Sequence, residues 1–183
     1  MLKDWLRLSC VKSLTVAQKQ ELAGVFGGPG ALFAAAEQSL AAIPWLGRPA
    51  VRELLDPGPA VTAAVQTDLE LMEQLGAIYL GFSDPEFPWL LKQIRGAPLG
   101  LFVLGDPALL ARPQVAMVGS RSTSPAGLAT ARDFARAFAM AGLVVTSGLA
   151  SGADSAAHDG CIRAGRPTIA VMGTGIDLSL IHI

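Results

Sequence analysis

Residues 115–177 constrain the fold most, because they hold three short apolar runs that each lead into a glycine-bearing turn. The runs are 115–118, 143–146 and 168–172, and the turns after them read GSRS, SGLASG and GTG. Two segments with helical periodicity separate the runs. Apolar strand, glycine turn, helix and next strand is the pattern of βαβ units in a parallel sheet. The turns after parallel strands meet at one sheet edge, where ligands bind, so we expect the three turns to line one crevice.

The composition excludes several classes of protein. With 51% hydrophobic and 16% charged residues among 183, the chain has material for a core, and charge, Gly or Pro interrupts every apolar run before it could span a membrane. Cys10 and Cys161 form no disulfide framework, so we expect a cytoplasmic protein. The net charge of −1 does not by itself indicate a nucleic-acid binder. Every base after residue 76 except Lys92 is Arg, the residue suited to bidentate phosphate contacts.

Residues 1–75 are predicted to form a helical module. An amphipathic helix opens the chain, and Thr15 is a suitable N-cap for a second helix over 16–26 that GGPG at 27–30 ends. Further helical segments follow at 31–36, 39–43, 51–55 and 61–75. Short helices with tight turns resemble SAM-like or helix-hairpin-helix modules. We favour a packing or docking role without a ligand of its own, since fold does not fix function.

Residues 76–114 are interpreted as an extension packed on the sheet, leaving 115–183 as a partial βαβ core. We expect strands at 76–80 and 98–105, a short helical turn at 89–94 and a short helix or turn at 106–112. The aromatic residues here are candidate platforms for base stacking, although core packing is favoured for most of them: Tyr79, Phe82, Phe87 and Trp89.

The first glycine turn, GSRSTSPAG, favours an anion. It is not a dinucleotide fingerprint, because Arg121 stands where a second glycine would let a pyrophosphate approach. Backbone N–H groups at a strand-to-helix turn, four hydroxyl side chains and a guanidinium suit phosphate. The alternative is a capped helix with an exposed Arg.

The second turn, SGLASGADSAAH, offers polar groups at the start of a helix. Asp154 and the hydroxyls there either receive sugar or base donors or simply cap the helix. His158 lies four residues after Asp154, and a structural pair is favoured over acid–base machinery. Cys161 is expected to be a small buried residue rather than a nucleophile. Two His and two scattered Cys make a zinc site improbable, so no metal or cofactor is expected.

These motifs together resemble the DNA-processing protein A (DprA/Smf) family. The ordered set GSR, SGLAxGxDxxAH and GxGxD carries the resemblance, supported by YLGFSDPEFPWLLKQIRGAPLGLFVLG before it. The resemblance implies an extended Rossmann-like parallel sheet after a SAM-like module. It implies a non-catalytic cytoplasmic protein that binds single-stranded DNA, protects incoming strands in natural transformation (competence) and loads the RecA recombinase. The DNA-binding positions it implies are Gly119, Ser120, Arg121, Ser147, Gly148, Ala150, Gly152 and Asp154, with Arg163 and Arg166 as candidate basic contacts after His158.

One departure and one alternative accompany the resemblance. The family continues past GxGxD with further strands and helices, whereas here LSLIHI follows Asp177. We therefore expect a C-terminally incomplete sheet, and a homodimer like that of the full-length family is doubtful for this chain. The alternative function is a nucleotide-hydrolysing phosphoribohydrolase of the lysine-decarboxylase-like Rossmann proteins. The GTGID turn lacks the PGGxGT stretch of that group, which favours DNA binding.

Overall fold

The computed structural model describes residues 1–173. The chain divides into two compact units, one covering Met1–Gly105 and the other beginning at Asp106. The end of the predicted GTGID turn, with Asp177, and the LSLIHI sequence lie outside the described residues. Within the described part, no helix is both long and apolar enough to cross a membrane.

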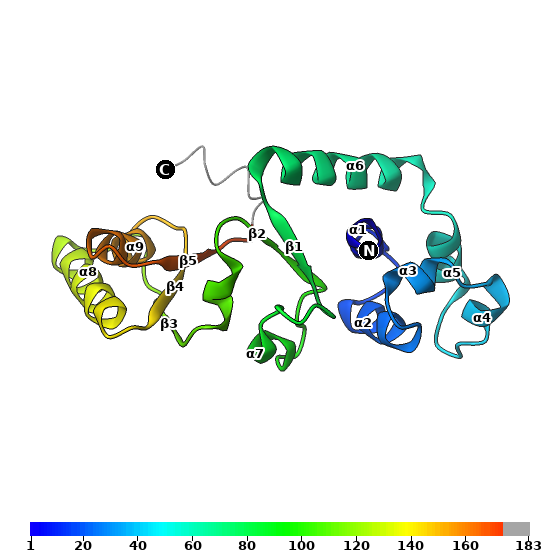
Figure 1. Cartoon of the computed structure of the whole chain (residues 1–183), viewed down its shortest axis with the longest axis horizontal. Helices are drawn as coiled ribbons and strands as arrows, with labels where there is room; N and C mark the ends of the chain where they lie inside the picture. The colour runs from blue at the N-terminus through cyan, green and yellow to red at the C-terminus, as the bar shows by residue number, and fades with distance from the viewer. Residues whose placement is uncertain (174–183) are drawn as a thin grey trace. The chain divides into compact units, whose positions relative to one another are not determined.

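Six helices build most of the first unit (Figure 1). The second of them starts as the sequence predicts: Thr15 and Gln18 form a capping box, in which each side chain bonds the backbone of the other. A core of leucines from all but the longest helix includes the fully buried Leu8, Leu22 and Leu40. The helices are α1 Leu2–Ser9, α2 Val16–Val25, α3 Pro29–Phe33, α4 Glu37–Ala41, α5 Arg48–Leu55 and α6 Gly58–Leu75.

A small antiparallel hairpin completes the first unit. Strands β1 (Ile78–Gly81) and β2 (Gly100–Val103) pair, with the short helix α7 (Trp89–Lys92) between them. Gly81 lies against the Trp5 indole so closely that a Cβ there would be 2.5 Å from Nε1. The Gln20 amide donates to the Ala97 carbonyl at 2.8 Å. These contacts join residues 76–105 to the helices, so the compact units divide after Gly105 rather than at the boundary expected after residue 75.

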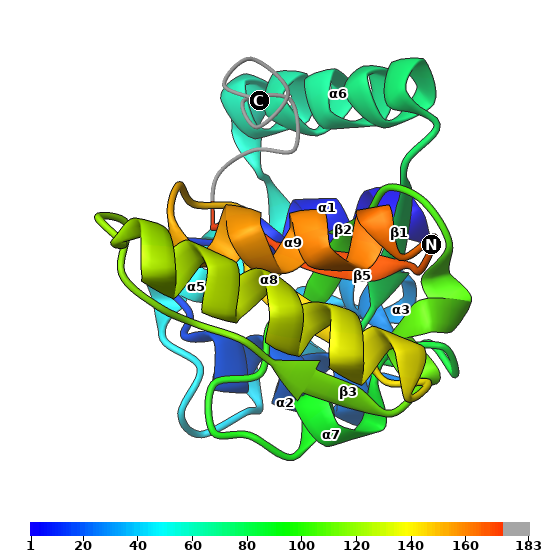
Figure 2. The same ribbon diagram turned by 90° about the vertical axis from the view of Figure 1, so that its left-hand side faces the viewer.

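The second unit is a parallel sheet with two helices. It contains the 3-10 helix η1 (Pro107–Ala111), and its strand order is β3-β4-β5 with every pair parallel. Helices α8 and α9 lie side by side on the sheet (Figure 2). Ala135 and Ala139 of α8 and Ala157 and Cys161 of α9 pack on the buried Val145. The remaining elements are β3 Gln114–Ala116, α8 Pro125–Met140, β4 Val144–Gly148, α9 Ala153–Arg163 and β5 Thr168–Val171.

The α/β class is therefore confirmed: a helical N-terminal region precedes a small parallel sheet. The sheet orientation fixes the candidate site. Because β3, β4 and β5 are parallel, the segments after each strand leave the sheet at the same edge, and the helices that return across the sheet begin at that edge. The first two glycine turns are thus neighbours, as predicted.

Candidate nucleic-acid interface

The GSR turn is fixed to the start of α9 by hydrogen bonds. The Ser120 carbonyl accepts one bond from the Ala153 amide at 3.1 Å and another from the Thr123 hydroxyl at 2.6 Å. The Ser120 hydroxyl accepts from the Ser122 amide at 3.1 Å, which tightens the turn internally. The turn after β3 and the first residue of α9 therefore form one connected structure.

Two glycines allow the turn and the helix to meet. A Cβ at Gly119 would lie 2.5 Å from the Ala153 Cβ. Gly152 has a φ of +84°, and a Cβ there would collide with the Ser120 carbonyl oxygen and lie 2.5 Å from that of Arg121. Only glycine combines that backbone conformation with that separation. The glycines thus set the shape of the edge.

Two further bonds and one close approach order the first turn of α9. The Ala150 carbonyl accepts from the Ser155 amide at 3.2 Å and from the Ser155 hydroxyl at 2.6 Å. A Cβ added to Gly148 would lie 2.6 Å from a carboxylate oxygen of Asp154. A carboxylate in the first turn also interacts favourably with the helix dipole. The Asp154 side chain makes no capping hydrogen bond, so its interaction with the helix dipole is what accounts for it in the absence of a ligand.

Arg121 projects from this fixed turn into solvent. Its side chain is exposed, as are Ser122 and Ser124, and Ser124 caps α8 by accepting from the Gly127 amide at 3.1 Å. Within residues 1–173 the Arg121 guanidinium makes neither an ion pair nor a hydrogen bond to another residue. The N-termini of α8 and α9 share this edge, and each contributes the positive end of its dipole. The edge is therefore suited to an anion.

Ser147 and His158 face the interior instead. The Ser147 hydroxyl donates to the Met117 carbonyl at 2.6 Å and the residue is 4% exposed, so it ties β4 to the segment after β3. His158 Nδ1 lies 2.9 Å from the Thr168 hydroxyl, whose own proton goes to the Val145 carbonyl. Nδ1 is therefore the donor in that bond. Both side chains serve the packing of the sheet.

Burial also shifts the pKa values of His158 and Cys161, the two side chains here that resemble catalytic groups. Burial lowers the pKa of His158, against smaller opposing effects from the Gly148 backbone and the Asp154 carboxylate. Burial raises the pKa of the Cys161 thiol, which donates to the Ala135 carbonyl at 3.7 Å. A buried thiol with a raised pKa is a poor nucleophile, and the His158 imidazole is only 6% exposed. Residues 1–173 contain no cluster of three or more potential metal-ligating side chains.

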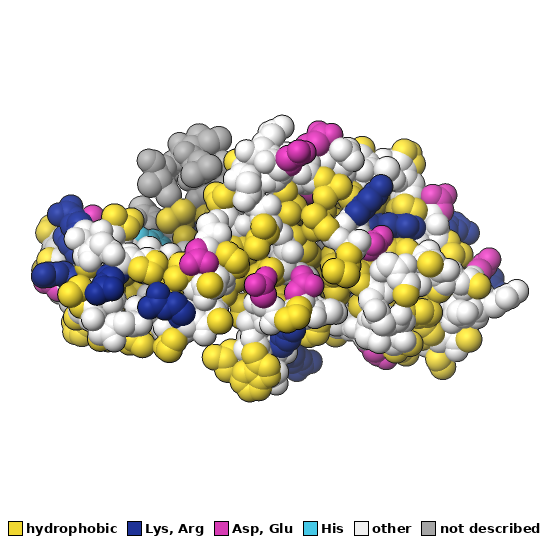
Figure 3. All heavy atoms as spheres, viewed as in Figure 1, with side chains coloured by type: hydrophobic (Ala, Val, Ile, Leu, Met, Phe, Trp, Pro, Cys, Tyr) yellow, Lys and Arg dark blue, Asp and Glu magenta, His cyan; other side chains and the backbone are white. Residues whose placement is uncertain are grey.

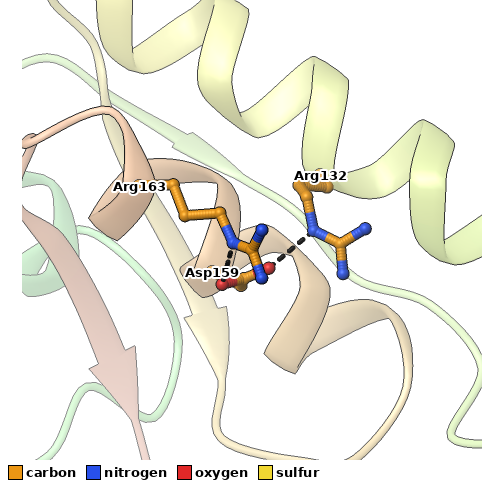
Figure 4. Close-up of polar contacts among 3 residues, drawn as sticks. All are labelled: Arg132, Asp159 and Arg163. Carbon is orange, nitrogen blue, oxygen red and sulfur yellow. Dashed lines mark hydrogen bonds and ion pairs between the residues drawn. The ribbon is translucent and has the colours of Figure 1, made fainter.

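The structure does not bring Arg163 and Arg166 to the GSR turn. Arg163 is the last residue of α9 and Arg166 lies between α9 and β5, so both lie at the opposite end of the helix from Gly152. Asp159 accepts from Arg132 Nε at 2.6 Å and from Arg163 Nε at 2.7 Å (Figure 4). The hydrogen bonds from Arg163 and then Arg132 hold the pKa of Asp159 below its ordinary value.

A basic surface accompanies α8 and α9. Dark-blue Arg side chains are spread over the part of the molecule that holds these helices (Figure 3). Arg132 and Arg136 of α8 were not among the predicted contacts, although their spacing of four residues already places them on the same side of one helix. Arg136 is exposed, whereas Arg132 is committed to Asp159.

Comparisons with known proteins agree with this geometry. The sequence model of the family described as "DNA recombination-mediator protein A" matches residues 78–180. The DNA processing protein DprA of Streptococcus pneumoniae is 43% identical over 95 residues, which cover 52% of this chain and 33% of that protein. Protein Smf of Synechocystis is 37% identical over 114 residues, covering 60% of this chain and 29% of the relative.

A solved structure extends the agreement to the fold. The X-ray structure of DprA from Streptococcus pneumoniae superimposes with a TM-score of 0.54 at 35% identity, covering 69% of this chain and 46% of the other. In sequence, the matched part of this chain spans about a third of the length of these curated relatives. The matched region includes both of the first two glycine turns. The chain belongs to the DNA recombination-mediator protein A family.

Proposed function

We propose that this chain binds single-stranded DNA along the sheet edge formed by the GSR turn and the start of α9. The observation that carries the proposal is Arg121, an exposed guanidinium on a turn whose backbone is fixed to Ala153 and crowded against Gly152. A positioned cation beside two helix N-termini suits a phosphate. Contacts of this kind hold a nucleic-acid backbone without reading its sequence.

The residues of the edge divide into contacts and supports. Arg121, with the Ser122 and Ser124 side chains, contacts the phosphates. Gly152 lets the GSR turn approach the helix start, Gly119 and Gly148 make room for the Ala153 side chain and the Asp154 carboxylate, and the Ala150 carbonyl orders the first turn of α9. The Ser120 carbonyl accepts the two hydrogen bonds, from the Ala153 amide and the Thr123 hydroxyl, that hold the turn in place.

Arg163 and Arg166, at the other end of α9, add further phosphate contacts for the DNA strand in this proposal. Arg166 is exposed and makes no ion pair within the described residues, whereas Arg163 shares Asp159 with Arg132. We assign Arg166 as the first phosphate contact at that end of α9. Arg163 joins it through the guanidinium nitrogens that Asp159 does not use.

We further propose a biological setting for this binding: protection of incoming DNA during natural transformation and delivery of that DNA to RecA in the bacterial cytoplasm. No catalytic step is assigned, because His158 and Cys161 are buried in the core. We propose the homodimer and the RecA contact by likeness to relatives, of whose length the matched part of this chain spans about a third. Linking two such edges in a dimer would raise the affinity for one strand without new contacts.

A salt titration tests the binding. Fluorescence anisotropy of a labelled oligothymidylate, measured at several salt concentrations, should show binding that weakens steeply with salt. Arg121→Ala should weaken binding by about tenfold and reduce the salt slope by about 0.7, the value for one phosphate contact on a single strand. Arg48→Ala, an exposed Arg at the start of α5, is the matched control and should change little.

Two results would overturn the proposal. One is the absence of oligonucleotide binding at low salt by the intact chain. The other is an equal effect of the Arg121→Ala and Arg48→Ala substitutions, which would place no special contact at the turn. Release of free base from a nucleoside monophosphate by the purified chain would instead support the phosphoribohydrolase alternative.

A further inference from the structure

Helix α7 begins with Trp89, the most exposed aromatic side chain among those of the first unit whose exposed fraction is given below. Trp89 is 68% exposed, whereas Trp5 is 3% and Trp45 is 37% exposed. Leu90 at 73% and Ile94 at 54% exposed lie in the same short segment. Yellow side chains project at the position of α7 in the space-filling view (Figure 3).

The segment beneath Trp89 is anchored, so the exposure of Trp89 is not that of a frayed end. Phe87 is only 2% exposed and its ring lies 5.6 Å from that of Phe82. The Lys92 ammonium donates to the Asp84 carbonyl at 3.1 Å and lies 5.5 Å from the centre of the Phe87 ring. The Asp84 carboxylate in turn accepts from a β1 amide, that of Gly81. These contacts fix the segment that leads into α7, so the Trp89 indole is held in solvent at a defined position.

The charges beside Trp89 indicate which kind of ligand this surface favours. Residues 89–96 contain two bases, Lys92 and Arg95, and no acid. The two carboxylates of the segment, on Asp84 and Glu86, precede Trp89, and that of Asp84 is turned to the Gly81 amide. Arg95 is exposed and has no ion-pair partner in the described part of the chain. Figure 3 shows dark blue next to the projecting yellow side chains.

We propose that Trp89 is a stacking platform for an unpaired base of the single strand, with Arg95 at an adjacent phosphate. An exposed indole beside cations matches the two faces of a nucleotide, the flat base and its charged phosphate. Stacking is tolerant of sequence because every base has a π face. This inference rests on the proposed function and adds a second contact, on the unit that does not contain Arg121.

The intrinsic fluorescence of Trp89 and a base-free probe test the stacking. Oligothymidylate should quench tryptophan emission of the intact chain, and Trp89→Leu, which keeps the apolar surface, should abolish most of the quenching. The same substitution should raise the dissociation constant for oligothymidylate at least about fivefold. Trp89→Phe should restore part of the affinity. An abasic oligomer of equal length should bind the intact chain and Trp89→Leu equally. Trp45→Phe is the control and should leave both affinities unchanged.

The possible failures are distinguishable from one another. If Arg121→Ala weakens binding of oligothymidylate and Trp89→Leu does not, the stacking platform is wrong and the proposed function stands. If Trp89→Leu weakens binding of the abasic oligomer equally, the contact is not stacking and the inference is overturned. It is also overturned if Trp89→Leu only abolishes self-association of the chain in ultracentrifugation, which would identify a second copy as the occupant. Absence of any oligonucleotide binding would remove both proposals.

Discussion

At the residue scale, the candidate site depends on which side chains are exposed to solvent and which make hydrogen bonds inside the protein. Arg121 could be selected from sequence because it replaces a glycine in a strand-to-helix turn. Ser147 looked equally available in the sequence, but its hydroxyl is directed to the Met117 carbonyl. Adjacent residues of a strand point to opposite faces. The face that carries Ser147 is decided by the pairing of β4, which the sequence alone does not specify.

Gly152→Ala tests the fixed turn. Its left-handed φ and its contact with the Ser120 and Arg121 carbonyls should together lower the stability of the second unit by about 2–4 kcal/mol. Gly165→Ala is the matched control, because Gly165 is also left-handed, at φ +64°, with nothing within 4 Å of a Cβ. It should cost about 1–2 kcal/mol.

The second unit contains no tryptophan but includes the buried Cys161, so pulsed alkylation of that thiol across a urea titration reports its unfolding. Mass spectrometry of the modified peptides separates Cys161 from Cys10. Equal urea midpoints for the two glycine variants would show that the contact between Gly152 and the GSR turn contributes nothing.

At the element scale, the accuracy of prediction followed the local signals. Helix α8, one of the two helical segments expected between the apolar runs, has strong local signals in the sequence: Ser124 caps it, Pro125 occupies its first position and Gly142 follows its end. The GGPG sequence follows the end of α2 as predicted, but its Pro29 also begins α3, two residues before the helix expected from residue 31. Proline is compatible with a first helical position because its missing N–H is not needed there.

The two ion pairs of Asp159, with Arg132 of α8 and with Arg163 of its own helix, give a prediction about pH. The folded pKa of Asp159 lies below its ordinary value, so its bonds stabilise the fold above that ordinary value and are lost as the pH falls through the lowered one. Asp159→Asn should therefore reduce resistance to urea slightly at neutral pH. The difference from the unsubstituted chain should shrink as the pH falls below about 4.

Far-ultraviolet circular dichroism across urea titrations at several pH values measures this difference. Asp133→Asn on the exposed side of α8 is the control, because Asp133 has no ion pair within the described residues. The ion-pair account fails if Asp159→Asn and Asp133→Asn have the same midpoint at neutral pH.

At the scale of the whole molecule, the composition of residues 76–105 did not reveal where they pack. A strand-like run after a helical module was interpreted as an extension of the sheet that follows. The structure joins it to the helices through contacts between residues far apart in sequence, Trp5 with Gly81 and Gln20 with Ala97. Such long-range contacts leave no local pattern. The order of the βαβ elements, in contrast, did predict a parallel sheet and a common edge for the first two glycine turns.

Hydrogen–deuterium exchange with and without saturating oligothymidylate tests directly whether DNA binds at the edge formed by the GSR turn and the start of α9. It measures the exchange rates of backbone amides and needs no substitution. A strand bound at this edge should slow exchange in peptides covering residues 118–127 and 148–156, which hold the GSR turn and the starts of α8 and α9. Peptides from the helical core of the first unit should exchange at unchanged rates. Unchanged exchange at both turns, in a chain that anisotropy shows to be saturated with oligonucleotide, would contradict the assignment of this edge as the binding site.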